Sequence, residues 1–347
     1  MKVLINVPCL SQPGGVSNHF IGLRCYWNNQ VTYNVIGRRN NYLSYLILIY
    51  DYFKFFVKCL FVKYDVIVLN PSLGKTAIKR DALFLIISKF LKIKTVVFFH
   101  GWDSEAVNKI ENNPKYFVRV FNKADSILVL AGSFRKTLLK WGVKKPIYLT
   151  TTKVDDRLLK GFSMDSKPIE STILFLARIE ENKGIFIILE AFKHILKKFP
   201  NVKLIVAGEG GALNRAKKKV KKAPIKQVEF LGNINGNLLI DTFRRSSIYV
   251  LPTTHGEGMP TSVIEAMAFG LPVITRPVGG INDFFENEKM GYLMDSLDPK
   301  DYANALIRLI ENPDRCSQIG EYNHNFAKEH FLASKVVRQL ENLLMNG

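Results

Sequence analysis

Cysteine is scarce in this chain of 347 residues, which contains only Cys9, Cys25, Cys59 and Cys316. The four cysteines form no C-x-x-C pair and no cluster with histidines. This pattern argues against a zinc site or a disulfide framework and fits a reducing compartment. We therefore expect a cytoplasmic protein without a structural metal.

We also expect neither a signal peptide nor a membrane-spanning segment. Met1 to Val7 reads as a strand rather than a signal peptide. Residues 42–62 are rich in Leu, Ile, Tyr and Phe, but Asp51, Lys54 and Lys58 interrupt them at helical spacing, and such charges are costly at the centre of a bilayer. We favour a nearly buried helix of an α/β domain. The alternative is an aromatic, lysine-bearing helix that docks on a bilayer.

Acidic residues are few in the first part of the chain. Residues 1–150 contain 22 basic and 7 acidic residues, a net charge of +15, whereas residues 151–347 contain 27 and 23, a net charge of +4. The excess is either a solvated basic surface or a surface that approaches an anionic partner. Because no nucleic-acid-binding signature accompanies it, we expect an anionic membrane rather than a nucleic acid.

Strands and helices alternate along the chain, with glycine turns at strand ends. This alternation predicts two doubly wound parallel sheets in an α/β fold. We expect an N-terminal domain at residues 1–160, a C-terminal domain at 170–325, and a helix at 326–347 that packs back on the N-terminal domain. The expected strands are Lys2–Val7, Asp65–Asn70, Lys94–Phe99 and Ser126–Leu130, then Ile173–Leu176, Val202–Ala207, Val228–Leu231 and Ile248–Leu251.

The stretch from residue 255 to 281 combines a loop, a helix and a strand. Glu257 lies in a glycine-flanked loop, and a helix is expected from Pro260 or Thr261 to Gly270. The free N–H groups of such a helix open at the carboxyl edge of a parallel sheet, where phosphates bind. Glu265 follows one turn into the helix. Its spacing from Ser262 also fits a capping box, so a purely structural role stays open.

Three features of the first half also lie at strand ends. Gly14 and Gly15 would let a ligand approach the backbone, although they equally suit a plain turn. His100 ends an apolar strand and is either a ligand-edge residue or a structural histidine. Lys75 belongs to a Gly-Lys-Thr triplet that is similar to a P-loop, but Leu69 occupies the position of the first glycine. We therefore do not expect a working P-loop.

The residues just described carry a resemblance to a known family. Arg178, Lys183, Glu257 and Glu265, with the phrase EGMPTSVIEAMAFGLPVITRPVGG, resemble the retaining glycosyltransferases of the GT-B fold, family 4. The Gly14–Gly15 loop and His100–Gly101 are similar as well. The likeness is strongest over residues 173–290 and weaker over 1–150. It implies two Rossmann-like domains that face each other across a cleft, with a nucleotide diphosphate sugar held mainly by the C-terminal domain.

The resemblance also implies roles for individual residues. Arg178 and Lys183 would stabilise the charge of the departing diphosphate, assisted by N–H groups near Thr261 and Ser262. Glu257 would contact the donor sugar and Glu265 the ribose. The remaining implied donor or catalytic residues are Gly14, Gly15, His100, Gly258 and Met259.

A retaining hexosyl transfer by front-face attack is implied, with no metal and no cofactor besides the donor. No Asp-x-Asp lies between the expected strands, and the cationic pair would replace the metal ion. The expected acceptor is lipid-linked or membrane-bound, in cell-envelope polysaccharide, lipopolysaccharide or glycolipid synthesis, with the protein peripheral at the inner face of the cell membrane. The alternatives are a sugar-nucleotide epimerase of the same fold, a P-loop NTPase, and a non-catalytic carbohydrate-binding scaffold.

Overall fold

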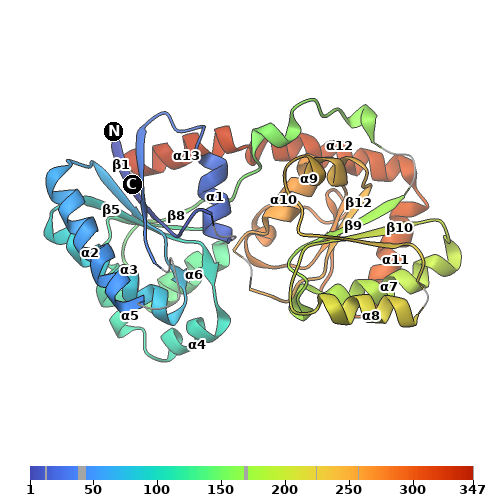
Figure 1. Cartoon of the computed structure of the whole chain (residues 1–347), viewed down its shortest axis with the longest axis horizontal. Coiled ribbons are helices and arrows are strands. Elements are labelled where there is room, and N and C mark those ends of the chain that lie inside the picture. Colours follow the sequence, from blue (N-terminus) through green and yellow to red (C-terminus); the bar gives the residue numbers. More distant parts are fainter. Residues whose placement is uncertain (12–13, 38–43, 168–170, 224, 257, 347) are drawn as a thin grey trace. The chain divides into compact units, whose positions relative to one another are not determined.

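The computed structural model describes residues 1–11, 14–37, 44–167, 171–223, 225–256 and 258–346. It divides into two compact units. Unit 1 comprises Met1–Lys153, Gly256–Met259 and Ala333–Gly347, and unit 2 comprises Val154–His255 and Pro260–Leu332. Each unit contains one six-stranded parallel sheet with helices on both faces (Figure 1).

Unit 1 begins with a strand and alternates strands with helices. Its elements are β1 (Lys2–Val7), α1 (Gly15–Leu23), β2 (Gln30–Val35), α2 (Ser44–Phe61), β3 (Val66–Leu69), β4 (Ser72–Leu73), α3 (Lys75–Phe90), β5 (Lys94–Phe99), β6 (Gly101–Trp102), α4 (Ser104–Asn112), α5 (Lys115–Phe121), β7 (Ser126–Val129), α6 (Gly132–Trp141), β8 (Ile147–Leu149) and α13 (Ala333–Asn346).

The large sheet of unit 1 has the strand order β2-β1-β3-β5-β7-β8. Its inner strands β1, β3, β5 and β7 are largely runs of buried apolar residues, as expected for a parallel sheet covered on both faces. One core cluster joins the sheet to α2, α3, α5 and α6, and includes Phe55, Phe84 and Trp141. The other joins it to α1 and α13, and includes Phe20 and Leu340.

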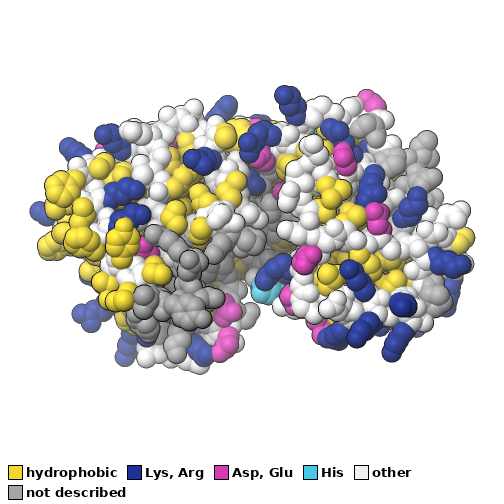
Figure 2. Space-filling model, in the orientation of Figure 1, with side chains coloured by type: hydrophobic (Ala, Val, Ile, Leu, Met, Phe, Trp, Pro, Cys, Tyr) yellow, Lys and Arg dark blue, Asp and Glu magenta, His cyan; other side chains and the backbone are white. Residues whose placement is uncertain are grey.

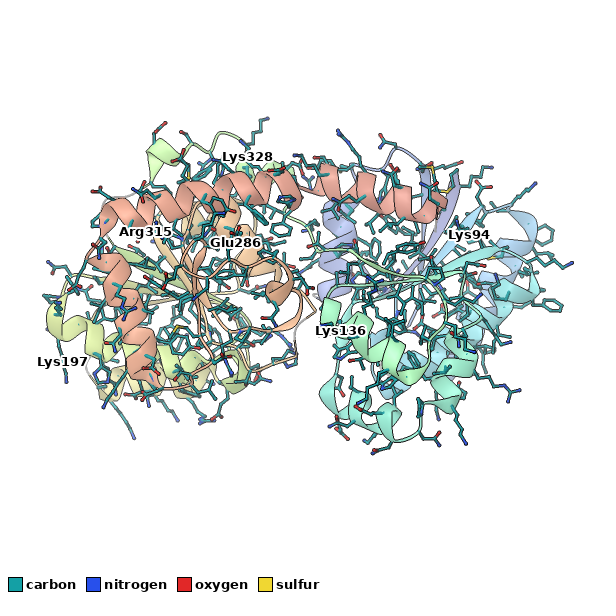
Figure 3. All side chains as sticks on the ribbon, turned by 180° about the vertical axis from the view of Figure 1, so that it is seen from behind. Lys94, Lys136, Lys197, Glu286, Arg315 and Lys328 are labelled. Carbon is teal, nitrogen blue, oxygen red and sulfur yellow. The ribbon has the colours of Figure 1, made fainter. Side chains whose placement is uncertain are left out.

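Helix α13 is part of unit 1 although it is the last element of the chain. The carboxylate of Glu341 accepts hydrogen bonds from the backbone N–H groups of Asn28 and Asn29, at 2.9 and 2.8 Å, and from the amide of Asn28 at 2.9 Å. Lys94 donates to the carbonyl oxygen of Met345 at 3.0 Å, near the end of the helix (Figure 3). These polar contacts supplement the apolar packing of α13 against the sheet and α1.

Unit 2 repeats the alternation. Its elements are η1 (Asp156–Leu159), η2 (Met164–Ser166), β9 (Thr172–Leu176), η3 (Glu181–Lys183), α7 (Ile185–Lys198), β10 (Lys203–Ala207), α8 (Leu213–Lys222), β11 (Val228–Gly232), α9 (Gly236–Arg244), β12 (Ile248–Leu251), α10 (Thr261–Ala268), β13 (Val273–Thr275), η4 (Gly279–Asp283), β14 (Gly291–Leu293), α11 (Pro299–Ile310) and α12 (Pro313–His330).

The sheet of unit 2 has the strand order β11-β10-β9-β12-β13-β14. Numbered from its own first strand, this is the 3-2-1-4-5-6 order of dinucleotide-binding folds. Helices α7, α8 and α11 cover one face, and α9, α10 and α12 cover the other (Figure 1). The order reverses between β9 and β12, which are paired in the sheet.

The predicted fold class is confirmed, and several elements have the expected bounds. β1, β5 and β12 begin and end where the sequence places them. The strand β2 is missing from the sequence prediction because its polar residues obscure the apolar run. The prediction for α2 is only half right: its inner face is buried, but its outer face exposes Phe53 and Phe61.

Among the described helices, none is both long enough and apolar enough to cross a bilayer.

Candidate functional site

The most conspicuous candidate site of unit 2 is the carboxyl edge of its sheet where the strand order reverses. The loops that follow β9 and β12 leave this edge side by side, because the two strands are parallel neighbours. Ligands of doubly wound folds bind in the crevice at such a switch point. The loop after β9 carries Arg178 and Lys183, and the segment after β12 leads to α10, which carries Thr261, Ser262 and Glu265.

The loop after β9 is held by the neighbouring loop after β10. The N–H of Ile179 donates to the carbonyl of Glu209 at 2.9 Å, and the N–H of Gly211 donates to the carboxylate of Glu180 at 3.0 Å. At Gly208, φ is +130° and an added Cβ would lie 1.9 Å from the carbonyl oxygen of Ala177, so only glycine fits. The backbone that carries Arg178 is therefore fixed on both sides, while the Arg178 side chain is exposed.

Lys183 ends the short helix η3, against the loop that follows β12. The N–H of Thr254 donates to the carbonyl of Asn182 at 2.8 Å. The next residue, Gly184, has φ of +84°, and an added Cβ would lie 2.5 Å from Cγ of Pro252. The backbone on either side of Lys183 is thus locked to the end of β12.

Lys183 is a buried cation. Only 5% of the surface of this residue is exposed to solvent. Burial, together with the nearby charge of Arg178, lowers the pKa of Lys183 to about 8. A bound anion would offset both effects by stabilising the protonated ammonium, so the position favours a negatively charged ligand.

Helix α10 begins at the edge of the same sheet. Its N-cap residue is Pro260, whose side chain makes no capping hydrogen bond. The capping-box alternative for Glu265 is wrong, because Ser262 lies inside the helix rather than at its N-cap. The Ser262 hydroxyl is instead hydrogen-bonded to the hydroxyl of Tyr249 at 2.7 Å.

Tyr249 joins three parts of this edge, and sequence reasoning missed it. It lies in β12, is fully buried, and donates to the carbonyl of Leu176 at the end of β9 at 3.0 Å. Burial raises its pKa, and the neighbouring Glu265 carboxylate acts in the same direction. The one signal in the sequence is a tyrosine inside an otherwise apolar strand, which suggests a hydroxyl with a buried partner.

Of the site residues predicted at positions 257 to 259, the structure describes Gly258 and Met259. Glu257 itself lies outside the described residues. Gly258 and Met259 group with unit 1. Gly258 is buried, and an added Cβ would lie 2.5 Å from the carbonyl oxygen of His100, so a side chain at this position would displace the backbone at His100. Met259 packs against the core cluster that contains Phe20.

His100 follows β5 in unit 1 and is part of a polar chain. Its Nε2 atom lies 3.0 Å from Oδ1 of Asn70, and the Asn70 amide nitrogen donates to the carbonyl of Asn6 at 2.7 Å. Because Asn70 thereby presents its oxygen to the ring, Nε2 carries the proton and Nδ1 is the acceptor. Burial lowers the pKa of His100 to about 3, so the imidazole is neutral at physiological pH.

Gly14 and Gly15 form the beginning of α1 in the same unit, where both are exposed. An added Cβ at Gly15 would meet nothing within 4 Å, and one at Gly14 only the Ser17 hydroxyl at 3.8 Å. The space before this helix end is therefore open to an approaching group. One turn later, His19 lies edge-on to His100, with ring centroids 5.1 Å apart, and these contacts link the start of α1 to the end of β5.

The Gly-Lys-Thr triplet does not open onto a phosphate loop. The short strand β4 lies between β3 and α3 and pairs with β6. Gly74 is the N-cap residue of α3, and its N–H donates to the carbonyl of Ser72 at 2.7 Å. This turn leaves no room for the wide glycine loop that cradles phosphates in a P-loop.

Comparison with known proteins agrees with this geometry. Residues 162–326 match the family model described as Glycosyl transferases group 1. An uncharacterized glycosyltransferase of Methanocaldococcus jannaschii is 25% identical over 273 residues, which are 74% of this chain and 69% of that protein. The phosphatidyl-myo-inositol mannosyltransferase of Mycobacterium tuberculosis H37Rv is 28% identical over 164 residues, 45% of this chain and 43% of that protein. Several of the curated relatives are thus matched over about half of their length or less.

Solved structures extend the likeness to the whole chain. The crystal structure of Anabaena Alr3699/HepE in complex with UDP-glucose superposes with a TM-score of 0.78 at 18% identity and covers 100% of both chains. At this identity the likeness shows the fold, which is the two-domain α/β architecture called GT-B. The switch-point edge of unit 2 lies within the matched family domain.

Gly184 offers a test of the described geometry of this edge. We expect Gly184→Ala to destabilise the protein by about 3 kcal/mol or more, because strain at positive φ and a clash with Pro252 add up. Gly236→Ala is the matched control: φ is +54° there, but an added Cβ meets nothing within 4 Å, so its cost is expected to be about 1 kcal/mol. Urea unfolding measures both, and equal costs would contradict the packing described for Gly184.

Proposed function

Residues 162–326 match the family model described as Glycosyl transferases group 1, and from this likeness we propose that the protein is a retaining, metal-independent glycosyltransferase that uses a nucleotide diphosphate sugar. The observation that carries the proposal is the pair of cations, Arg178 and Lys183, on the loop after the first strand of a 3-2-1-4-5-6 sheet. This loop stands at the topological switch point, beside the segment that leads to the N-terminus of α10.

The diphosphate of the donor would bind to this cationic edge. When the glycosidic bond breaks, negative charge grows on the departing diphosphate, and fixed positive groups stabilise it. Lys183 is suited to this role because its side chain is buried and the backbone on either side of it is fixed, so little reorganisation would accompany the reaction. The first N–H groups of α10 provide further donors and the positive end of a helix dipole.

The two carboxylates of the family phrase would bind the two sugars of the donor. Glu265, half-buried one turn into α10, would accept hydrogen bonds from the ribose hydroxyls. Glu257 would contact the hydroxyls of the transferred sugar. Neither is proposed as a nucleophile, so retention would proceed by front-face attack, with the departing phosphate helping to take the acceptor proton.

Unit 1 would provide the contacts to the transferred sugar and the acceptor. The neutral imidazole of His100 is proposed to accept a hydrogen bond through Nδ1 from a sugar hydroxyl, because its Nε2 is committed to Asn70. Gly14 and Gly15 would admit the donor phosphates to the open end of α1. With a pKa near 3, His100 is expected to act as a hydrogen-bonding group rather than as a general acid.

The acceptor is proposed to be lipid-linked or membrane-bound, as in the synthesis of a cell-envelope polysaccharide, lipopolysaccharide or glycolipid. Support comes from the net charge of +15 on residues 1–150 and from the relative named as a phosphatidyl-myo-inositol mannosyltransferase. The protein would then be cytoplasmic and peripheral at the inner face of the cell membrane. Transfer of labelled sugar from the donor to an organic-extractable product tests this; exclusive transfer to water-soluble acceptors would contradict it.

A sugar-nucleotide epimerase is the main alternative, because the same fold serves both reactions. It predicts that the donor is consumed with no acceptor present, whereas the transferase needs one. A P-loop NTPase would need a wide glycine loop before Lys75, but the strand β4 occupies the segment before Gly74. A non-catalytic carbohydrate-binding scaffold would not require the cationic pair at the switch point.

We expect Lys183→Ala and Arg178→Ala each to weaken binding of the cognate nucleotide diphosphate by roughly tenfold or more. A thermal-shift screen of nucleotides and nucleotide sugars identifies the ligand, and calorimetry then measures the affinities. Lys75→Ala is the control that should leave affinity unchanged. A loss confined to Lys75→Ala would refute the proposed site.

Lys183 should also make the affinity for the donor depend on pH. Without a bound nucleotide Lys183 has a pKa of about 8, and the bound diphosphate would raise it, so binding takes up a proton above pH 8. Affinity should therefore fall as pH rises through 8 in the wild type. In Lys183→Arg the decline should be absent, because a guanidinium stays protonated throughout that range. A wild-type affinity that is constant across this range would contradict the role of Lys183.

The ribose contact of Glu265 is tested by comparing a ribonucleotide with its 2′-deoxy analogue. Glu265→Gln should weaken binding of the ribonucleotide by about tenfold and weaken binding of the 2′-deoxy form less, since the deoxy form offers only its 3′-hydroxyl to the carboxylate. Calorimetry on both ligands gives the two ratios. An equal loss for both would mean that Glu265 acts structurally in α10.

Stereochemistry and metal dependence are tested in one transfer reaction followed by NMR. The new glycosidic bond should keep the anomeric configuration of the donor, and EDTA should leave the rate nearly unchanged, because the cationic pair takes the place of a metal ion. A trapped covalent glycosyl-enzyme at an Asp or Glu would refute front-face attack. Activity lost with EDTA and restored by manganese would refute metal independence.

A further inference from the structure

Helix α2 has two apolar stripes, and only one of them is covered by the core. The inner stripe includes Tyr52, Phe55 and Cys59, which pack against the rest of unit 1. The outer stripe is exposed and repeats at intervals of three, four and seven residues; Phe53 is 65% and Phe61 is 81% exposed. Its members are Leu46, Ile49, Tyr50, Phe53, Leu60 and Phe61.

Helix α3 lies beside α2 and continues the exposed apolar surface. The Phe84 ring of α3 contacts the rings of Tyr52 and Phe55, with centroids 4.6 and 4.9 Å apart. On its own outer side α3 exposes Leu83, Ile86 and Phe90, the last at 77%. We name these three residues and the six of the outer stripe of α2 the α2–α3 face. Large apolar side chains exposed in such number on adjacent helices mark an interaction surface.

Within α2 and α3, the acidic side chains are buried and the charges that reach the surface are positive. The only acidic residues in the sequences of α2 and α3 are Asp51 and Asp81, which are 1% and 0% exposed. Asp51 accepts from the backbone N–H of Gly37 at 2.7 Å, and Asp81 pairs with Arg80 at 2.6 Å. Both carboxylates are therefore buried within unit 1 and add no negative charge to the α2–α3 face.

Lysines border the same surface. Lys63, Lys79 and Lys92 are exposed, and Lys54 and Lys58 are half-buried. Figure 2 shows hydrophobic side chains gathered over α2, with Lys and Arg side chains among and beside them. Aromatic and aliphatic residues bordered by lysines, on a helix face without exposed carboxylates, are the composition of helices that lie in the headgroup region of an anionic membrane.

We propose that the α2–α3 face docks unit 1 onto an anionic lipid bilayer, with its apolar side chains inserted at the boundary between headgroups and acyl chains. The proposal deepens the proposed function, since a membrane-bound acceptor requires an enzyme at the membrane surface. A second copy of this chain is a poorer occupant. An isologous contact through this face would bring its lysines against the same lysines of the partner copy, whereas anionic lipid headgroups neutralise them.

The test is co-sedimentation of the full chain with vesicles of phosphatidylcholine containing anionic phosphatidylglycerol, without any donor. The wild type should bind at low salt, more weakly at high salt, and least to pure phosphatidylcholine. The triple variant Phe53→Ser, Phe61→Ser, Phe90→Ser should lose roughly 100-fold or more in partition coefficient, because about three exposed rings no longer enter the bilayer. Circular dichroism checks that it remains folded.

Two matched controls locate the surface. Leu139→Ser, Leu149→Ser and Leu238→Ser together remove three exposed apolar side chains outside the face and should change partition by less than about threefold. Substitution of Lys54, Lys58, Lys63 and Lys92 by Gln should lower binding to anionic vesicles by roughly fivefold per lysine. The same change at Lys217, Lys218, Lys221 and Lys222 of α8 removes equal charge and should have a smaller effect.

Several results would overturn the proposal. These are no wild-type binding at low salt, an unchanged triple variant, a larger loss from the α8 lysines than from those of the face, or a dimer that depends on the three phenylalanines while vesicle binding does not. The outcome is separate from that of the donor site. If the protein binds vesicles but no nucleotide, this inference stands and the proposed function is refuted. If it binds nucleotide but no vesicles, this inference is refuted and the proposed donor site stands.

Discussion

Lys183 is an ammonium group held out of water at the point where the sheet of unit 2 reverses its strand order. A lysine that is 5% exposed is costly to keep charged unless an anion accompanies it. The surrounding structure keeps it there: Gly184 fits only without a side chain against Pro252, and Asn182 is hydrogen-bonded to the loop after β12. Tyr249 then joins β9 and β12 to α10. The arrangement amounts to a prepared position for a negative ligand.

The two units are specialised in different ways. Unit 2 contains the loop with the cations and the helix N-terminus at one sheet edge. Unit 1 contains the neutral His100 in a polar chain with Asn70 and Asn6, an open end of α1, and the α2–α3 face. The excess of positive charge lies in the residues of unit 1, where the catalytic chemistry needs it less. This distribution is understandable if unit 1 meets a membrane and unit 2 meets the nucleotide.

Much of this architecture was predictable from the sequence, since parallel strands buried on both faces are short apolar runs. The bounds of α10 were predictable for a related reason: Pro260 precedes its first residue, and Gly270 has positive φ just past its end. The cationic pair was recognisable only through resemblance to a family, because nothing local distinguishes Lys183 from a surface lysine. The backbone on either side of it is fixed by residues about 70 positions away, at the end of β12.

Other features could not be predicted for physical reasons. In α2 both stripes are apolar, so periodicity cannot tell which one the core covers. The protonation of His100 depends on Asn70, which in turn depends on Asn6, and such long-range contacts leave no spacing in the sequence. The capping box that the spacing of Ser262 and Glu265 left open does not form, because Pro260 is the N-cap residue, two positions earlier. A shift of two positions changes which groups a helix end can bind.

The central claim is that the cationic edge of unit 2 holds the diphosphate of a donor. The most direct measurement is a crystal structure of the protein with its nucleotide diphosphate bound. We expect the phosphate oxygens within hydrogen-bond distance of Nζ of Lys183 and the guanidinium of Arg178, with N–H groups of α10 pointing at them. A nucleotide bound at the turn before α3, or anywhere away from Lys183, would contradict the account.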